Sequence, residues 1–364
     1  MVISADFWRG RRVFVTGHTG FKGSWLALWL RQMGAELCGY ALSPPISPSL
    51  YELAGLEEFM PGVGGDVRNL AALTAAMSRF QPHLVFHLAA QALVRPSYED
   101  PLDTYAVNVM GTAHLLEAVR RVASVRAVVV VTSDKCYDNR EWIWPYRECE
   151  PLGGYDPYSS SKACAEILTA SFRRSFFRAA GHAAGVATVR AGNVIGGGDW
   201  NRDRLLPDCF RALVRKEEVL LRNPHAVRPW QHVLDALAGY LGLAERLAQS
   251  PGFAEAWNFG PEGSDTVAVE ELVRRVAALW GRGASWRSAA GDAPHEAQVL
   301  RLDSSKARDR LGWRPRWDLD AALRHTVEWY QAWAAGANMR DFSLQQIAAY
   351  QGEGAVAEAA GGAA

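Results

Sequence analysis

An apolar stretch at residues 127–131 ends in a cluster of reactive side chains, Thr132, Ser133, Asp134 and Lys135. Five apolar residues without alternation predict a strand that is buried on both faces of a parallel sheet. Open parallel sheets bind ligands outside the carboxyl ends of their strands, so these four side chains are candidates for a binding or catalytic site. The alternative is an ordinary polar turn, because loops are generally polar.

Tyr158 and Lys162 stand four residues apart, and this spacing places both side chains on one face of a helix. An ammonium group beside a phenol lowers the pKa of the phenol toward neutrality, and the phenolate can then act as a base on an alcohol. The same spacing also occurs by chance on helix surfaces, where such a pair contributes little.

A glycine-rich turn lies between the first predicted strand, residues 11–16, and a helical run that begins at Ser24. Glycine allows a tight turn and the close approach of a pyrophosphate, and the helix N-terminus adds free N–H donors. In this position the turn predicts a dinucleotide site, and it is not a P-loop because no Gly-Lys-Ser/Thr follows. The expected cofactor contacts are Gly17, Thr19, Gly20, Phe21, Lys22 and Gly23.

The second predicted strand, residues 36–41, ends without the acidic residue that usually binds the adenosine ribose. No arginine follows it to accept a 2′-phosphate, so NAD is favoured over NADP. The missing acid also suggests, as a hypothesis, that NAD is held loosely.

Other strand ends supply further candidate cofactor contacts. Asp66 either contacts the adenine amino group or caps the helix predicted at residues 70–80. Asn108 lies in a long helix at about 101–122, where it either contacts the cofactor or bonds to the backbone. The small residues after the strand at 83–88 let a flat ring lie close to the backbone. The expected contacts are Asp66, Val67, Leu88, Ala89, Ala90, Asn108, Tyr158 and Lys162.

Composition limits the classes of function. The chain has 364 residues, 49% of them hydrophobic, and 39 basic residues balance 39 acidic ones. No overall positive field recruits nucleic acid or an anionic membrane. Five cysteines without paired spacing argue against a disulfide framework and a metal site. With neither a signal core nor a spanning segment, we expect a cytoplasmic protein.

The pattern of elements predicts a Rossmann-type, doubly wound parallel α/β sheet with a smaller C-terminal α/β substrate lobe. We expect a dinucleotide-binding domain at residues 1–190, to which later segments return, and a sugar-nucleotide lobe at 191–336. A C-terminal extension follows at 337–364, and its Ala- and Gly-rich part, 352–364, is expected to be disordered. Arginines scattered after residue 200 suit phosphate binding, although solvated surface arginines would look the same.

Together, the glycine turn, the reactive strand end and the Tyr-x-x-x-Lys pair are the parts of a nicotinamide-dependent alcohol oxidation site. Over about residues 8–336 the chain resembles the extended short-chain dehydrogenase/reductase superfamily. The blocks 132–137, 190–200 and 228–233 resemble, more specifically, the CDP-glucose branch of the nucleotide-sugar 4,6-dehydratases.

This resemblance implies an internal redox cycle on CDP-glucose that feeds deoxysugar biosynthesis. Tyr158 would take the proton of the 4-hydroxyl while hydride passes from C4 to NAD; water would leave from C6, and the hydride would return to C6. Ser133 would bind the 4-oxygen, and Asp134 would protonate the departing hydroxyl. The resemblance implies substrate contacts from Arg95, Ser97, Asn193, Arg204, Leu205, Arg228 and His295.

Lys135 leaves the proton acceptor for C5 open. The dTDP-glucose dehydratases resemble this chain but carry a glutamate there, which is regarded as the base. Either Lys135 is a desolvated neutral base, or it stays charged and stabilises the enolate while another group or water takes the proton.

Two other functions fit parts of the pattern. A nucleotide-sugar C4 epimerase, or a 4,6-dehydratase of another nucleotide sugar, shares Tyr158 and Lys162, but an epimerase has no use for an elimination pair. A non-catalytic NAD-binding sensor typically loses the tyrosine. The helices near 101–122 and 157–178 are candidates for pairing with a second subunit, in a homodimer or homotetramer.

Overall fold

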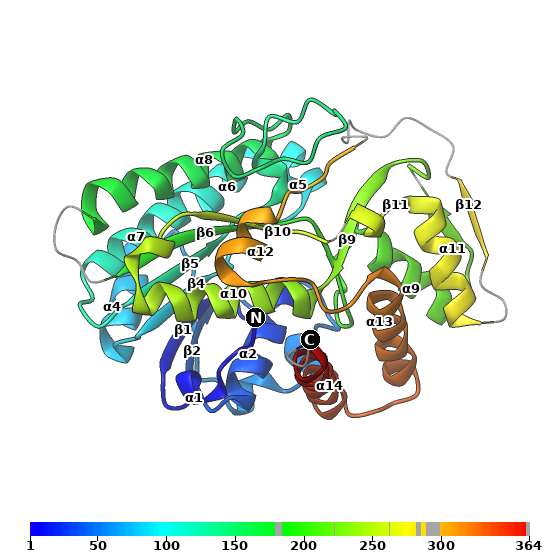
Figure 1. Cartoon of the computed structure of the whole chain (residues 1–364), viewed down its shortest axis with the longest axis horizontal. Coiled ribbons are helices and arrows are strands. Elements are labelled where there is room, and N and C mark those ends of the chain that lie inside the picture. Colours follow the sequence, from blue (N-terminus) through cyan, green and yellow to red (C-terminus); the bar gives the residue numbers. More distant parts are fainter. Residues whose placement is uncertain (179–183, 222, 262, 282–284, 289–298, 362–364) are drawn as a thin grey trace.

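The computed structural model describes residues 1–178, 184–221, 223–261, 263–281, 285–288 and 299–361, with side chains up to Gly352 except those of Ser264 and Ser288. Its main feature is a seven-stranded sheet in the order β10-β6-β5-β4-β1-β2-β3, with every neighbouring pair parallel (Figure 1). The strands are β1 (Arg12–Thr16), β2 (Glu36–Ala41), β3 (Gly62–Gly64), β4 (Leu84–His87), β5 (Ala127–Val131), β6 (Gly185–Ala191) and β10 (Ala256–Phe259). The strand order reverses at β1, where such sheets bind ligands.

Helices cover both faces of this sheet and enclose a core on each. One face carries α2 (Phe21–Gln32), α10 (Val233–Gln249) and α12 (Ser305–Leu311), and the other carries α4 (Leu70–Phe80), α7 (Gly111–Arg120) and α8 (Pro157–Phe172). On β5, Val129 packs in the core under α10, whereas Val128 and Val130 pack in the core under α4 and α7. The strand is therefore buried on both faces, as its composition predicts.

Two helices on the second face change their winding. The helix predicted at about 101–122 is α6 (Pro101–Tyr105), a π-helical turn η2 (Ala106–Met110) and then α7. After α8 comes a second π-turn, η4 (Arg173–Phe177). The first of these turns carries Asn108, and such π-turns are frequent at functional sites.

A smaller lobe stands beside the carboxyl ends of the main strands. Its sheet has the order β11-β9-β7, and β8 pairs with β12. The lobe is built from β7 (Asn193–Ile195), α9 (Leu205–Arg215), β8 (Val219–Leu221), β9 (Val227–His232), β11 (Thr266–Ala268), α11 (Val269–Trp280), β12 (Trp286–Ser288) and α13 (Leu319–Ala334). Short elements complete the chain: α1 (Ala5–Trp8), α3 (Leu50–Leu53), η1 (Leu56–Glu58), α5 (Val94–Glu99), η3 (Asp134–Cys136), η5 (Pro251–Phe253) and η6 (Gly263–Asp265).

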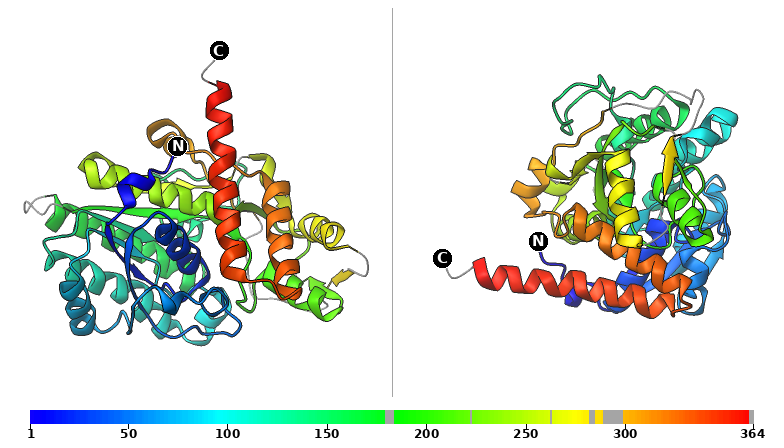
Figure 2. Two further views of the ribbon diagram at one scale, coloured as in Figure 1. Left: turned by 90° about the horizontal axis from the view of Figure 1, so that it is seen from below. Right: turned by 90° about the vertical axis from the view of Figure 1, so that its right-hand side faces the viewer.

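The last helix, α14 (Met339–Gly361), returns from the smaller lobe to pack on α2 (Figure 2). The helix extends to Gly361, into the part at 352–364 for which composition predicts disorder. Residues 362–364 lie outside the described part, and the expected disorder stays a prediction. None of the helices in the described ranges is long and apolar enough to span a bilayer.

The fold class is confirmed: a doubly wound parallel sheet with a smaller α/β lobe. The predicted strand at 36–41 and helix at 70–80 have the observed bounds. Strand β10 joins the main sheet from far along the chain, beside β6.

Candidate active site

A cavity of about 690 Å³ opens at the carboxyl ends of β1, β4, β5 and β6, between the main sheet and the smaller lobe. It brings together nearly all of the predicted contact residues. Those that line it are Gly17, Thr19, Gly20, Phe21, Lys22, Gly23, Asp66, Val67, Leu88, Ala89, Ala90, Arg95, Ser133, Asp134, Lys135, Tyr158, Lys162, Asn193, Arg204, Leu205 and Arg228. His295 lies outside the described residues.

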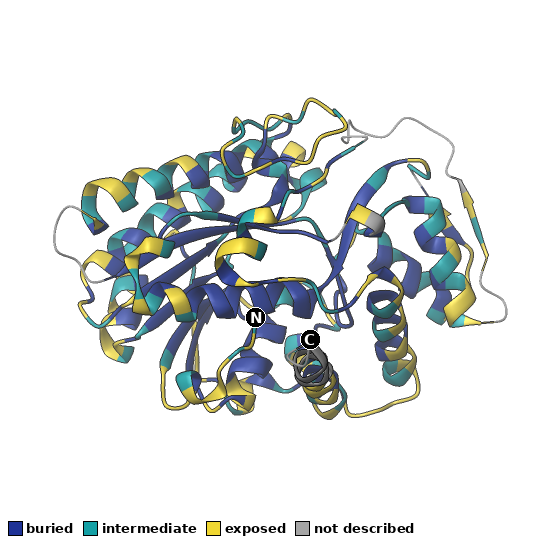
Figure 3. Cartoon of the chain, viewed as in Figure 1, coloured by how far each residue is buried: buried dark blue, intermediate teal, exposed yellow. Residues whose placement is uncertain are grey.

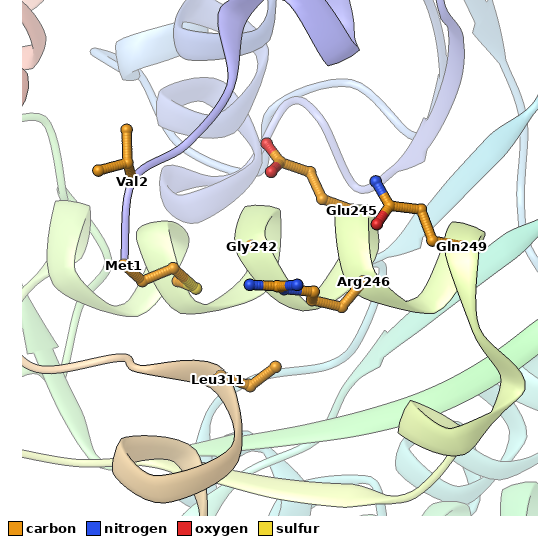
Figure 4. A pocket seen from close by; sticks show the side chains of 7 residues that line it. All are labelled: Met1, Val2, Gly242, Glu245, Arg246, Gln249 and Leu311. Carbon is orange, nitrogen blue, oxygen red and sulfur yellow. The ribbon is translucent and has the colours of Figure 1, made fainter.

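A second, smaller cavity of about 180 Å³ lies between the N-terminal segment and α10 (Figure 4). Its one carboxylate, on Glu245, accepts hydrogen bonds from Ser4 N and Trp8 Nε1. It contains none of the predicted site residues. The larger cavity is therefore the candidate active site.

The turn from β1 into α2 fits a pyrophosphate. Gly17 has φ +73°, and a Cβ there would lie 2.6 Å from Ala89 N, so glycine is required. At Gly20 a Cβ would meet only Gly17 O, at 3.4 Å, which leaves the space above the turn open to a ligand. Helix α2 starts at Phe21 without a side-chain cap, so its first N–H groups remain available to an anion.

The structure corrects one of the two roles considered for Asp66. The N-cap of α4 is Asn69, whose Oδ1 accepts a hydrogen bond from Ala72 N. Asp66 pairs with Arg68 instead, and the hydrogen bond to Arg68 is the main cause that lowers the pKa of Asp66. The helix-cap role is wrong because that position lies three residues further along; the adenine contact stays a prediction.

Two predicted contact residues lie behind the cavity wall rather than on it. Asn108 is buried and bonds to Gln91 N, Gln91 O and Ser161 Oγ, which ties the end of β4 to α8. The hydroxyl of Ser97 is fully buried and accepts a hydrogen bond from Tyr158 N. Both side chains hold neighbouring parts of the site in place, and their contacts with a ligand stay predictions.

The catalytic end of the cavity is formed where β5 runs into η3 and meets α8. Ser133 Oγ donates to Asp134 Oδ1 at 3.0 Å, and Ser133 is close enough to Tyr158 to oppose the rise of the Tyr158 pKa. Lys162 Nζ lies 3.4 Å from Val131 O and 6.0 Å from the centroid of the Tyr158 ring. An alcohol between Ser133 and Tyr158 would meet two hydroxyl groups at once.

Burial sets the pKa values of these groups. It raises the pKa of Tyr158 to about 12, lowers the pKa of Lys162 to about 8 and raises the pKa of Asp134. The predicted fall of the phenol pKa is therefore not found with these residues alone, because loss of solvent outweighs the charge of an amine that points at Val131 O. The raised pKa of Asp134 suits a proton donor.

Sequence reasoning missed a buried ion pair directly beneath this wall. Glu166 and Arg190 are each 3% exposed at the side chain and form a salt bridge of 2.9 Å. Two features of the sequence could have indicated it. Glu166 stands four residues after Lys162 on α8, and Arg190 is a charged residue within the otherwise uncharged strand β6.

Known proteins resemble this chain in sequence along most of its length. The model of the GDP-mannose 4,6-dehydratase family matches residues 14–326. The chain belongs to this family. Among curated members, it is 53% identical over 353 residues to the CDP-glucose 4,6-dehydratase of Salmonella typhimurium, covering 96% of this chain and 98% of that one. It is also 28% identical over 328 residues to the UDP-glucose 4-epimerase of Mycolicibacterium smegmatis, covering 88% of this chain and 98% of the epimerase.

Solved structures share the fold of this family member along most of its length. An epimerase from Methanothermobacter thermautotrophicus superposes with a TM-score of 0.79 at 23% identity, covering 91% of this chain and 95% of that one. A dTDP-glucose 4,6-dehydratase from Bacillus anthracis, solved in complex with NAD, superposes with a TM-score of 0.74 at 21% identity, covering 88% and 97%. The resemblance predicted from the motifs is confirmed.

Proposed function

We propose that this protein is a hydro-lyase that converts CDP-D-glucose to CDP-4-dehydro-6-deoxy-D-glucose with NAD as its cofactor. The observation that carries the proposal is the convergence of Ser133, Asp134 and Lys135 with Tyr158 and Lys162 at one end of the cavity. An oxidation site and an elimination site thus share one wall. The 53% identity to a CDP-glucose 4,6-dehydratase supports the substrate.

The residues divide the reaction between them. NAD, which the turn at residues 17–23 would hold, would supply the hydride acceptor for C4 of the sugar and the hydride donor for C6. Tyr158 takes the proton of the 4-hydroxyl, Ser133 holds the 4-oxygen, and the charge of Lys162 favours the phenolate. The resulting ketone acidifies the C5 hydrogen, which leaves as a proton, either to a neutral Lys135 or, where Lys135 stays charged and stabilises the enolate, to another group or water. C5 takes up a proton again when hydride reaches C6. Asp134, buried with a raised pKa, donates its proton to the 6-hydroxyl, which leaves as water.

The smaller lobe supplies cavity residues that suit the diphosphate and the nucleotide. Arg204 and Arg228 line the cavity, together with Asn193 and Leu205. Arg204 is held by Asp199, which is buried, at 2.6 Å. Guanidinium groups that are fixed in this way suit a diphosphate.

We also propose that NAD is held loosely. The end of β2 places Ala41, Leu42 and Ser43 on the cavity wall, where a ribose-binding carboxylate would otherwise stand. A preparation that is fully active without added NAD would contradict this proposal.

A second copy of the chain is the proposed partner. Helices α6 and α8 pack side by side, and large apolar side chains stand exposed along them and η2: Leu102 is 80% exposed, Met110 51% and Ile167 57%. Apolar groups that line adjacent helices favour burial against an identical surface.

The substrate is tested by incubating the purified protein and NAD with CDP-glucose, dTDP-glucose and UDP-glucose in turn. We expect a 4-keto-6-deoxy sugar from CDP-glucose. Epimerised sugar, or no turnover of any of the three, would overturn the proposal. Epimerisation is the main alternative, because a UDP-glucose 4-epimerase is among the relatives.

A further inference from the structure

The residues Thr132–Tyr137, which we call the catalytic segment, are anchored at both ends by a single ion pair. At the first end, Thr132 Oγ1 donates to Glu166 Oε1 at 2.5 Å. At the other end, Arg190 Nη1 donates to the Tyr137 hydroxyl at 2.8 Å. Glu166 and Arg190 hold each other through two parallel hydrogen bonds of 3.0 and 2.9 Å. Ser133, Asp134 and Lys135 lie between the two anchors.

The ion pair is held in place, because nearly all of its hydrogen-bond donors and acceptors have partners. Glu166 Oε2 accepts a further hydrogen bond from Thr188 Oγ1 at 2.7 Å, so each carboxylate oxygen has two donors. Arg190 Nη1 also donates a hydrogen bond to Glu148 O at 3.3 Å, and the Tyr137 hydroxyl donates one to Asn258 Oδ1 at 2.7 Å. These bonds join α8, β6 and β10 beneath the segment.

Stability alone does not account for such a pair. Burying two charges costs desolvation free energy, and well-packed apolar residues often do as well or better. What the pair adds is directional: a bidentate guanidinium–carboxylate contact fixes distances and angles that apolar packing leaves loose. The pair bonds to the two end residues of the segment that carries Ser133, Asp134 and Lys135. Fixed distances and angles there determine where these three side chains lie.

Glu166 also acts on the second half of the site. It lies one helical turn after Lys162 on α8, and its charge opposes the effect of burial on the pKa of Lys162. Burial alone raises the pKa of Glu166, but Arg190, Thr132 and Thr188 together keep it below its usual value. The carboxylate beside Lys162 is therefore charged.

We propose that Glu166 and Arg190 are positioning residues for the dehydratase reaction: they fix the catalytic segment at both ends, and Glu166 places a carboxylate one helical turn from Lys162. This inference rests on the function proposed above. Neither residue is among those that line the cavity. Loss of the anchors should lower kcat while leaving KM and the fold largely intact, because the reacting groups drift relative to a sugar that is bound elsewhere in the cavity.

The structure offers a matched pair of variants. Thr132→Val and Thr188→Val each remove one hydroxyl that donates to the same carboxylate, but only Thr132 belongs to the catalytic segment. We expect Thr132→Val to lower kcat about 10- to 100-fold with KM changed by less than about threefold, and Thr188→Val to stay within about threefold of wild type. Tyr137→Phe, at the other anchor, should resemble Thr132→Val. Melting temperature and NAD binding, measured for every variant, report on folding.

Glu166→Gln tests the effect on Lys162 through the pH profile of kcat. Lys162 is charged below its pKa, and removing the negative neighbour lowers that pKa, so the alkaline limb should move to lower pH in Glu166→Gln. Thr132→Val keeps the carboxylate and should leave the limb in place. A merely structural role would lower kcat equally at every pH.

The outcomes separate the two proposals. If wild type does not convert CDP-glucose, the proposed function fails, and this inference fails with it. If wild type is active but the two threonine variants lose kcat equally, or only in proportion to lost melting temperature, the positioning role is overturned while the function stands. If Glu166→Gln does not fold, the threonine comparison decides.

Discussion

The proposed function assigns to the carboxyl group of Asp134 the proton donation that separates dehydration from simple oxidation. Burial raises its pKa, while Lys135 and Ser133 oppose that shift. A carboxyl in this environment keeps its proton to higher pH than one in water and can deliver it to a leaving hydroxyl. In the proposed reaction, Asp134 acts after the oxidation at C4 and takes no part in it.

We therefore predict that Asp134→Asn stops the reaction after oxidation. The amide cannot donate an acidic proton, so water loss should slow by about 100-fold or more, while Tyr158 still supports hydride transfer. Single-turnover absorbance of the reduced cofactor should rise and persist in the variant, whereas in wild type it rises and decays. A normal decay would show that another acid protonates the hydroxyl.

Lys135 gives a second prediction at this scale. In Lys135→Met the exchange of the C5 hydrogen with solvent deuterium should fall by about 100-fold, since the side chain either takes that proton or stabilises the enolate. The pH dependence of the exchange in wild type distinguishes the two roles: a neutral base gains activity as pH rises, and a charged stabiliser loses it. Exchange that is unchanged in the variant would contradict both.

The types and spacing of the residues predicted most of the side chains that line the cavity, but not how deeply they are buried. Ser133, Asp134, Tyr158 and Lys162 stand out in the sequence by type and spacing, and all four line the cavity. The raised pKa of Tyr158 depends on solvent exclusion by elements far apart in the sequence, which spacing does not report. For the same reason Ser97 could not be recognised as a support for the Tyr158 backbone.

At the scale of elements, α10 and α14 meet at a buried carboxyl group. Asp235, on the almost fully buried helix α10 (Figure 3), accepts hydrogen bonds through Oδ1 from the Tyr350 hydroxyl and Arg316 N, both at 2.7 Å. Among the described residues its Oδ2 has no hydrogen-bond partner. Burial raises the pKa of Asp235 to about 7, so below about pH 7 the carboxyl group is mostly protonated in the folded protein.

This arrangement predicts a pH-dependent stability. Because the pKa of Asp235 is higher in the folded state than in the unfolded state, its stabilising effect is complete below the unfolded pKa, near 3.8, and is lost as pH rises through about 7. Between about pH 5 and about pH 8, wild type should lose on the order of 3 kcal/mol of unfolding free energy relative to Asp235→Asn. Urea denaturation of both proteins measures this difference. Parallel pH curves would contradict it.

Helices and strands that show a local hydrophobic pattern were predicted well. Those that depend on contacts with residues far away in the sequence were not. The strand at 36–41 and the helix at 70–80 follow from apolar runs and helix periodicity. The π-turn η2 carries Asn108, whose amide bonds to Gln91 in the loop after β4 and to Ser161 on α8, and local sequence pattern does not report such contacts. Strand β10 finds its place only by pairing with β6.

At the scale of the whole molecule, the exposed apolar residues on α6 and α8 predict self-association. The double variant Leu102→Glu/Ile167→Glu should be monomeric, because it would place charges against an identical apolar surface. Leu279→Glu, which changes an apolar side chain that is 42% exposed on α11, is the matched control and should keep the wild-type mass. Light scattering after gel filtration gives the mass of each. A wild-type monomer, or an unchanged double variant, would contradict the predicted interface.

The whole cavity must carry out oxidation, water loss and reduction on one bound sugar, and this claim is tested most directly with CDP-glucose deuterated at C4. The account predicts a 4-keto-6-deoxy product that carries the deuterium at C6 of the same sugar, with a solvent-derived hydrogen at C5. Deuterium that is lost to solvent, or that remains at C4 of an epimerised sugar, would contradict it.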